Sequence, residues 1–303
     1  MGLSWGYGPA LPEEEAVRLL YRALDLGYEH FDTAALYRSE GLLARAFAEN
    51  RSKLLIASKV GLTAKSGGRM VDCKPETLRA ECEESLKRLD TGHIDLYYLH
   101  RLDPNVPIEE SVGAMAELVA SGKIGAIGLS EMSAATLRRA AAIHPIAAMQ
   151  SEYSPFSRNV EIAVLDACRE LGAAFVAFSP LGRGVLAGSL RDPAALHAQD
   201  VRRFLPRFSE ANWPANRQLA DAFILLAREA GVAPAQLSLS WVLSRGDHIL
   251  AIPGTTSLAH LEENRIVRDC GLVRDIDALI NQRTVQGERY PASVQATIDT
   301  EEF

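Results

Sequence analysis

The run Ile94-Asp95-Leu96-Tyr97-Tyr98-Leu99 is almost entirely apolar and ends at His100. Two earlier runs also end at a polar residue: Tyr28-Glu29-His30-Phe31 is followed by Asp32, and the apolar run Leu54-Leu55-Ile56-Ala57-Ser58 is followed by Lys59. Short apolar runs between turn-rich segments are typical of strands that are buried on both faces of a parallel sheet. Polar groups at the C-terminal ends of consecutive strands are how a parallel α/β barrel builds an active site.

Strand-like and helix-like segments alternate along the chain, which predicts a parallel sheet with right-handed crossovers. Seven strands are expected, near residues 30, 56, 97, 127, 148, 176 and 250. A closed barrel of this type needs eight, and the missing element is the first strand with the hairpin before it. Three alternatives remain open: the start is a truncation, another segment closes the barrel, or the barrel is open.

No linker or low-complexity tract divides the sequence, so one domain over residues 1–303 is expected. Helices are expected at about residues 13–26, 39–49, 75–89, 108–120, 133–142, 160–171, 215–230, 234–243 and 258–267. A long loop at about 191–214 and a polar, turn-rich tail at about 284–303 complete the chain.

The composition excludes several classes of function. The net charge is -7 with both signs interspersed, which argues against a nucleic-acid partner because phosphates need a basic patch. No apolar run reaches the roughly 20 residues of a membrane span. The four cysteines form no Cys-x-x-Cys pair, which favours a reduced, cytoplasmic location. No cluster has metal-ligand spacing, so no metal is expected.

In order and spacing, Asp32, Tyr37, Lys59 and His100 resemble the catalytic tetrad of the aldo-keto reductases. The segments Phe31-Asp32-Thr33-Ala34 and Gly128-Leu129-Ser130 also resemble motifs of that family, and the resemblance covers about residues 1–290. It implies a (β/α)8 TIM barrel and NADPH-dependent reduction of aldehydes or ketones to alcohols. The overall sequence looks like the microbial and plant branch of broad-specificity reductases, which suggests pyridoxal or small aromatic and aliphatic aldehydes as substrates.

The four tetrad residues suit the reduction of a carbonyl group. Tyr37 can give a proton to the carbonyl oxygen, although an ordinary tyrosine, with a pKa of about 10, is a weak acid at neutral pH. A nearby ammonium favours the phenolate, and Lys59 is the candidate, held in place by Asp32. His100 can donate a hydrogen bond to the substrate oxygen. Singly each residue also has a purely structural interpretation, but their joint order on a barrel pattern favours the catalytic one.

The family binds NADP(H) without a Gly-x-Gly-x-x-Gly turn, and no such turn follows a strand here. The resemblance implies that Ser130 and Gln150 hold the nicotinamide carboxamide and that Phe178 stacks on the nicotinamide. The segment Ser179-Pro180-Leu181-Gly182-Arg183-Gly184 resembles the loop that cradles the pyrophosphate, where glycines let backbone donors approach.

The adenosine end of the cofactor matches a later stretch. The resemblance places there Ile252, Gly254, Thr255, Thr256, His260, Glu263 and Asn264. Only His260 can add a positive charge where the family often has lysine or arginine. NADPH is therefore expected, and NADH stays open. Arg202, Arg203 and Arg207 of the long loop could clamp the cofactor or face solvent.

Trp5, Tyr7 and Arg101 are expected to line the substrate pocket with His100 and the tail. Arg38 stands where the family usually has glycine. Its guanidinium could help lower the pKa of Tyr37, attract an acidic substrate or face solvent, and the last is favoured. The sequence does not determine the oligomeric state. Two alternatives to an active reductase remain. One is an NADP(H)-binding regulatory subunit, as potassium-channel β subunits of this family are, and the other is a poorly active, N-terminally short reductase.

Overall fold

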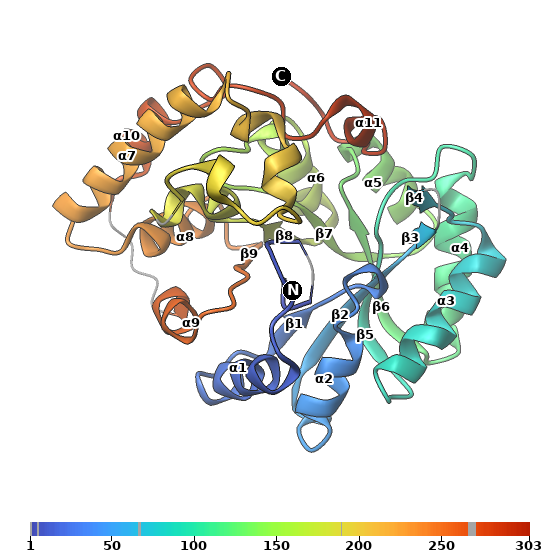
Figure 1. Ribbon diagram of the computed structural model, residues 1–303. Helices are drawn as coiled ribbons and strands as arrows, with labels where there is room; N and C mark the ends of the chain where they lie inside the picture. Colours follow the sequence, from blue (N-terminus) through green and yellow to red (C-terminus); the bar gives the residue numbers. More distant parts are fainter. Residues whose placement is uncertain (1, 5, 66–67, 189, 266–270) are drawn as a thin grey trace.

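The computed structural model describes residues 2–4, 6–65, 68–188, 190–265 and 271–303. Seven parallel strands follow one another in chain order around a curved, barrel-like sheet (Figure 1). Their bounds are β1 (His30–Asp32), β2 (Leu55–Val60), β5 (Ile94–Leu99), β6 (Ile124–Ser130), β7 (Ile146–Glu152), β8 (Ala174–Phe178) and β9 (Ile249–Ile252). All seven expected strands are confirmed, and the fold is the α/β barrel that the sequence predicts.

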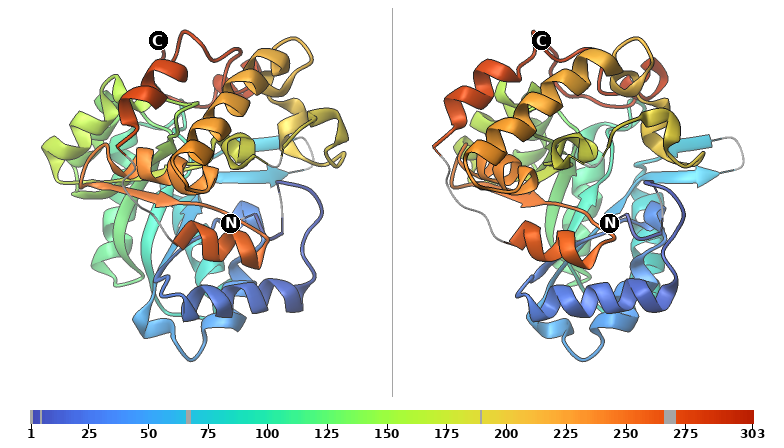
Figure 2. Two further views of the ribbon diagram at one scale, coloured as in Figure 1. Left: turned by 90° about the vertical axis from the view of Figure 1, so that its left-hand side faces the viewer. Right: turned by 60° about the vertical axis from the view of Figure 1, so that its left-hand side comes forward.

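The first and last strands of this sheet, β1 and β9, are its two edges. Among the described residues no backbone pairing joins them, and the N-terminal segment lies between them (Figure 1) (Figure 2). Leu3 of that segment is buried in the core, and its carbonyl accepts a hydrogen bond from Leu11 N–H. The segment is thus part of the packed structure on this side of the sheet.

Helices form a ring outside the sheet (Figure 1). They are α1 (Glu13–Asp25), α2 (Glu40–Phe47), α3 (Pro75–Arg88), α4 (Ile108–Ala120), α5 (Ala134–Ala141), α6 (Val164–Leu171), α7 (Trp213–Glu229), α8 (Pro234–Leu243), α9 (Leu258–Arg265), α10 (Val273–Leu279) and α11 (Ala292–Gln295). From α1 to α6 each helix packs against the next. Ser133 caps α5, since its hydroxyl accepts a hydrogen bond from Thr136 N–H, and Gly172 ends α6 with φ of 69°.

The core has two layers. The larger one fills the space between sheet and helices, and a smaller one fills the barrel itself. The inner layer consists of Ala57, Leu96, Tyr98, Ala148 and Val176. Because side chains alternate between the two faces of a strand, residues two positions further along also point inward. This places the polar residues at the C-terminal strand ends around one centre.

Several connections differ from the expectations. The segment after β2, for which neither helix nor strand was expected, contains an antiparallel hairpin of β3 (Leu62–Lys65) and β4 (Gly68–Val71). The long loop carries short 3-10 turns, and α7 begins at Trp213 within the expected loop. These turns are η5 (Pro193–Ala195), η6 (Val201–Phe204) and η7 (Pro206–Phe208); others are η1 (Ala35–Tyr37), η2 (Arg51–Lys53), η3 (Asn159–Glu161) and η4 (Gly182–Ala187). No helix within the described ranges is long and apolar enough to cross a membrane.

Candidate active site

Lys59 and Asp32 form a buried ion pair at the C-terminal ends of β2 and β1. Lys59 is 2% exposed and Asp32 7%, and the Lys59 ammonium donates hydrogen bonds to Asp32 Oδ1 and, at 2.9 Å, to the carbonyl oxygen of Thr33. Burial disfavours the charged form of Asp32, but the Lys59 charge and hydrogen bonds outweigh it, so the pKa of Asp32 lies below its ordinary value. The Asp32 carboxylate therefore stays ionised at neutral pH and holds the Lys59 side chain in place.

Tyr37 and His100 complete this constellation. Tyr37 lies in η1, and its hydroxyl oxygen is 3.4 Å from Nε2 of His100, which directly follows β5. The two rings meet edge to face with centroids 5.7 Å apart. The Lys59 ammonium lies 5.1 Å from the centroid of the Tyr37 ring. All four residues predicted to be catalytic thus meet at one place.

Gln150 joins this group from β7. Its side-chain amide donates to Asp32 Oδ2 at 2.8 Å, so both carboxylate oxygens of Asp32 accept hydrogen bonds. Ser130, its partner residue in β6, is also buried. Phe178 ends β8 beside Glu152, half-buried rather than within the core. The three residues expected at the nicotinamide therefore lie at the ends of three adjacent strands.

The segment after β8 has an unusual backbone. Ser179, Gly182, Arg183 and Gly184 all have positive φ, at 50°, 56°, 58° and 89°. Two of these residues are not glycine, and such conformations are uncommon for them. Successive backbone N–H groups in left-handed and turn conformations form concavities that suit anions. The segment, which includes Pro180 and Leu181, has a backbone shape compatible with an anion, and the N–H groups of Gly182 and Gly184 donate to the carbonyls of Ser179 and Leu181 within it.

The residues expected at the adenosine end run from the end of β9, through the turn that follows it, to the last turn of α9. Asn264 is 6% exposed, and its side-chain oxygen has no hydrogen-bond partner among the described residues. A buried, unsatisfied acceptor is costly, which fits a ligand amino group there. Thr255 Oγ1 accepts a hydrogen bond from Ser257 N–H. Gly254, Thr256 and His260 are exposed, and Ile252 and Glu263 half-buried.

The residues expected at the substrate pocket are only partly described. Trp5 lies outside the described residues. Tyr7 is exposed, with the Arg202 guanidinium 5.1 Å from its ring centroid. Arg101 is buried and donates to the carbonyl of His100 at 2.8 Å. Arg38 is exposed, as expected, and has φ of 54°, which explains why glycine suits this position.

The three arginines of the long loop tie that loop to the rest of the molecule. Arg202 forms an ion pair with Asp200 at 2.7 Å and donates to the Arg183 carbonyl. Arg203 donates to two carbonyls of its own loop. Arg207 donates to Ser157 Oγ at 2.7 Å and to the carbonyl of Gly287 in the tail. The loop thus reaches both the barrel and the tail.

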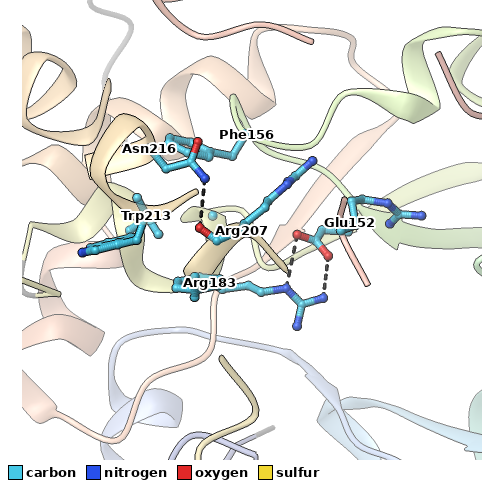
Figure 3. A pocket seen from close by; sticks show the side chains of 10 residues that line it. Glu152, Phe156, Arg183, Arg207, Trp213 and Asn216 are labelled. Atoms are coloured by element: carbon cyan, nitrogen blue, oxygen red, sulfur yellow. Dashed lines mark hydrogen bonds and ion pairs between the residues drawn. The ribbon is translucent and has the colours of Figure 1, made fainter. Parts of the chain in front are cut away.

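Sequence reasoning missed a buried ionic cluster beside these residues. Glu152 pairs with Arg183 (Figure 3). Glu131 pairs with Arg289 of the tail at 3.1 Å. Burial and the neighbouring charges of Arg289 and Arg183 lower the pKa of Arg207 to about 10, although Glu152 opposes this. Glu131 directly follows Ser130 with φ of 55°, so a strained residue adjoins the expected nicotinamide contacts. Its partner is 158 positions away, which no local pattern reveals.

The same cluster borders a small cavity (Figure 3). Its volume is about 10 Å³, room for about one water molecule. It is lined by Glu152, Phe156, Gly182, Arg183, Val185, Arg207, Phe208, Trp213, Asn216 and Arg289. None of the tetrad residues lines it, so this void belongs to the packing beneath the long loop.

Comparisons with known proteins agree with this geometry. Residues 1–275 match the model of the Aldo/keto reductase family. An aldo-keto reductase of Strobilurus tenacellus is 38% identical over 100% of this chain and 92% of its own length. The NADP(+) aldo-keto reductase yakc of Schizosaccharomyces pombe is 38% identical over 98% of this chain and 92% of its own. A glycerol dehydrogenase structure from Gluconobacter oxydans has a TM-score of 0.82 and 28% identity, covering 95% of this chain and 91% of that one.

Proposed function

Because this chain belongs to the aldo/keto reductase family, we propose that it reduces small aldehydes or ketones with NADPH and that Tyr37 is the proton donor. The chain is an NADP-dependent oxidoreductase by its family and relatives. The single observation that carries the role of Tyr37 is its position: its hydroxyl is beside His100 Nε2 and its ring beside the Lys59 ammonium.

When bound, NADPH supplies a hydride to the carbonyl carbon. Ser130 and Gln150 would hold its carboxamide, Phe178 its nicotinamide ring, the segment from Ser179 to Gly184 its pyrophosphate, and Asn264 its adenine. The positive φ angles of that segment and the unsatisfied oxygen of Asn264 support this fit. Thr255 and the start of α9 would meet the 2'-phosphate.

The protein side of the reaction is a proton transfer. His100 donates a hydrogen bond from Nε2 to the substrate oxygen and orients it toward Tyr37. The Tyr37 hydroxyl gives its proton to that oxygen as negative charge develops there. The Lys59 ammonium stabilises the phenolate that remains, and Asp32 keeps the ammonium in place.

The substrate class is broad within this proposal. Pyridoxal and small aromatic or aliphatic aldehydes are the expected substrates, in line with the resemblance of the whole sequence to broad-specificity reductases. Tyr7, Arg101 and the tail would shape the pocket. The complete tetrad favours turnover over a purely regulatory role.

The test is NADPH consumption by the purified chain with a panel of aldehydes, with Tyr37→Phe measured beside it. Oxidation that requires the aldehyde and is lost in the variant, while NADPH still binds, would support both parts of the proposal. Unchanged turnover in Tyr37→Phe would refute the proton-donor role. No oxidation by a folded wild-type protein that binds NADPH would favour the regulatory alternative.

A further inference from the structure

Three neighbouring strands place Lys59, Tyr98 and Gly128 in one row across the inside of the barrel. Lys59 of β2 is the cross-strand partner of Tyr98 in β5, and Tyr98 is the partner of Gly128 in β6. Tyr98 belongs to the inner core layer and is 0% exposed. It is therefore the immediate neighbour of the catalytic lysine within the sheet.

The Tyr98 ring packs directly against Gly128, which has no side chain. A Cβ atom added to Gly128 would overlap ring atoms Cδ1 and Cε1 of Tyr98. The ring thus lies directly on the backbone of β6, in space that any other residue type at 128 would fill. Since interiors are close-packed, a ring seated in this way has little freedom to move.

The Lys59 ammonium lies near two tyrosine rings. It is 5.1 Å from the centroid of Tyr37 and 5.8 Å from the centroid of Tyr98, both within the distance at which a ring attracts a cation. Asp32 and the Thr33 carbonyl accept its hydrogen bonds. The Tyr98 ring lies against the Lys59 ammonium in addition to these hydrogen-bond partners.

We propose that the Tyr98 ring, seated on Gly128, is a positioning residue that keeps the Lys59 ammonium against Tyr37. The inference rests on the proposed function of Lys59 and Tyr37. It concerns the ring rather than the hydroxyl group, which lies near the Gln150 side chain but forms no hydrogen bond of good geometry among the described residues. Removing that oxygen should therefore change the position of the Lys59 ammonium little, whereas removing the ring should change it.

The effect has a definite direction. Reduction requires Tyr37 in its protonated form, so the rate falls at alkaline pH as the phenol ionises. An ammonium held close stabilises the phenolate and makes this fall begin at lower pH. If Lys59 drifts away when the Tyr98 ring is absent, the alkaline limb of the pH–rate profile moves to higher pH.

The experiment compares Tyr98→Leu, Tyr98→Phe and a matched control, Tyr97→Leu. Tyr97 is equally buried in the same strand but belongs to the core layer on the helix side of the sheet, away from Lys59. In Tyr98→Leu we expect the alkaline fall of kcat/KM to occur at a pH higher by roughly half a unit. In Tyr98→Phe and Tyr97→Leu this fall should occur at the same pH as in the wild type. An unmoved limb in Tyr98→Leu, or an equal shift in Tyr97→Leu, would overturn the proposal.

A second variant guards against loss of folding. In Tyr98→Leu/Gly128→Ala the added methyl group occupies part of the space that the ring leaves, and the same shift is expected. A readout without turnover is the ultraviolet titration of the Tyr37 phenolate, taken as the difference between each variant and the same variant carrying Tyr37→Phe. If the wild type fails to reduce aldehydes, the proposed function fails, while this titration still decides whether the ring positions Lys59. An identical titration with and without the ring would refute it.

Discussion

The carboxylate of Glu152 at the end of β7 forms a two-point ion pair with the guanidinium of Arg183, although their side chains are only 2% and 11% exposed. Arg183 belongs to the segment proposed to hold the pyrophosphate. The pair therefore connects the barrel to that segment in an environment where charges are poorly screened.

Because of this pair, the stability of the protein should decrease at low pH. Burial alone would raise the pKa of Glu152, but the charges of Arg183 and Arg289 lower it to about 2. Because the folded value is depressed, the stabilisation is present above the ordinary pKa and is lost as pH falls from about 4.5 toward 2. It corresponds to about 3 kcal/mol. Urea unfolding measured across this pH range should show that the free energy of unfolding falls more steeply with decreasing pH in the wild type than in Glu152→Gln.

Glu117→Gln is the matched control for this prediction. Glu117 pairs with Arg79 on the surface, where both side chains are largely exposed. Its removal should leave the acid dependence as in the wild type. Equal slopes for the wild type and Glu152→Gln would contradict the prediction.

Lys59→Met should abolish carbonyl reduction and also destabilise the fold. Removing one partner of a buried ion pair leaves an uncompensated charge and costs about 3–5 kcal/mol. The double variant Asp32→Asn/Lys59→Met should recover stability without recovering activity. Steady-state kinetics and thermal unfolding of both variants separate the two effects. Full turnover in Lys59→Met would refute the role proposed for its charge.

Arg38→Gly should stabilise the protein by about 1 kcal/mol. Arg38 is exposed and has φ of 54°, a conformation that glycine adopts without the steric cost of a Cβ atom. Arg45→Gly, the same exchange at an exposed position inside α2, should instead destabilise by about 1 kcal/mol. Denaturant unfolding of the two variants tests the contrast. A loss of stability in Arg38→Gly would mean that its side chain makes a favourable interaction.

Arg289→Met should release the tail. Arg289 pairs with Glu131, and the two side chains are 4% and 0% exposed, so the loss should cost about 3–5 kcal/mol. Limited proteolysis should cut the last fifteen or so residues faster than in the wild type, because their backbone loses one of its anchors, beside the hydrogen bonds of Asp299 with Ser133 and Thr136. In Arg283→Met, a substitution at an exposed position nearby, the tail should be cleaved no faster than in the wild type. Equal proteolysis of Arg289→Met and the wild type would show that other contacts hold the tail.

Much of the barrel could be predicted from local patterns. The seven strands were identified because apolar runs bounded by turn residues depend only on neighbours in sequence. That Asp32, Lys59 and His100 meet was predictable because each follows such a run and parallel strands bring their C-terminal ends to one edge, whereas their grouping with Tyr37 as a catalytic tetrad came from the resemblance to the family. The hairpin of β3 and β4 was missed because its strands of four residues carry little periodicity.

The alternation along β5 determines by itself that Tyr98 and His100 share one face of the strand and that Tyr97 takes the other. That Tyr98 rests on Gly128, and that Glu131 meets Arg289, only the tertiary structure decided. These contacts join residues far apart in the chain, and they depend on strand register and on the course of the tail, which no local periodicity encodes.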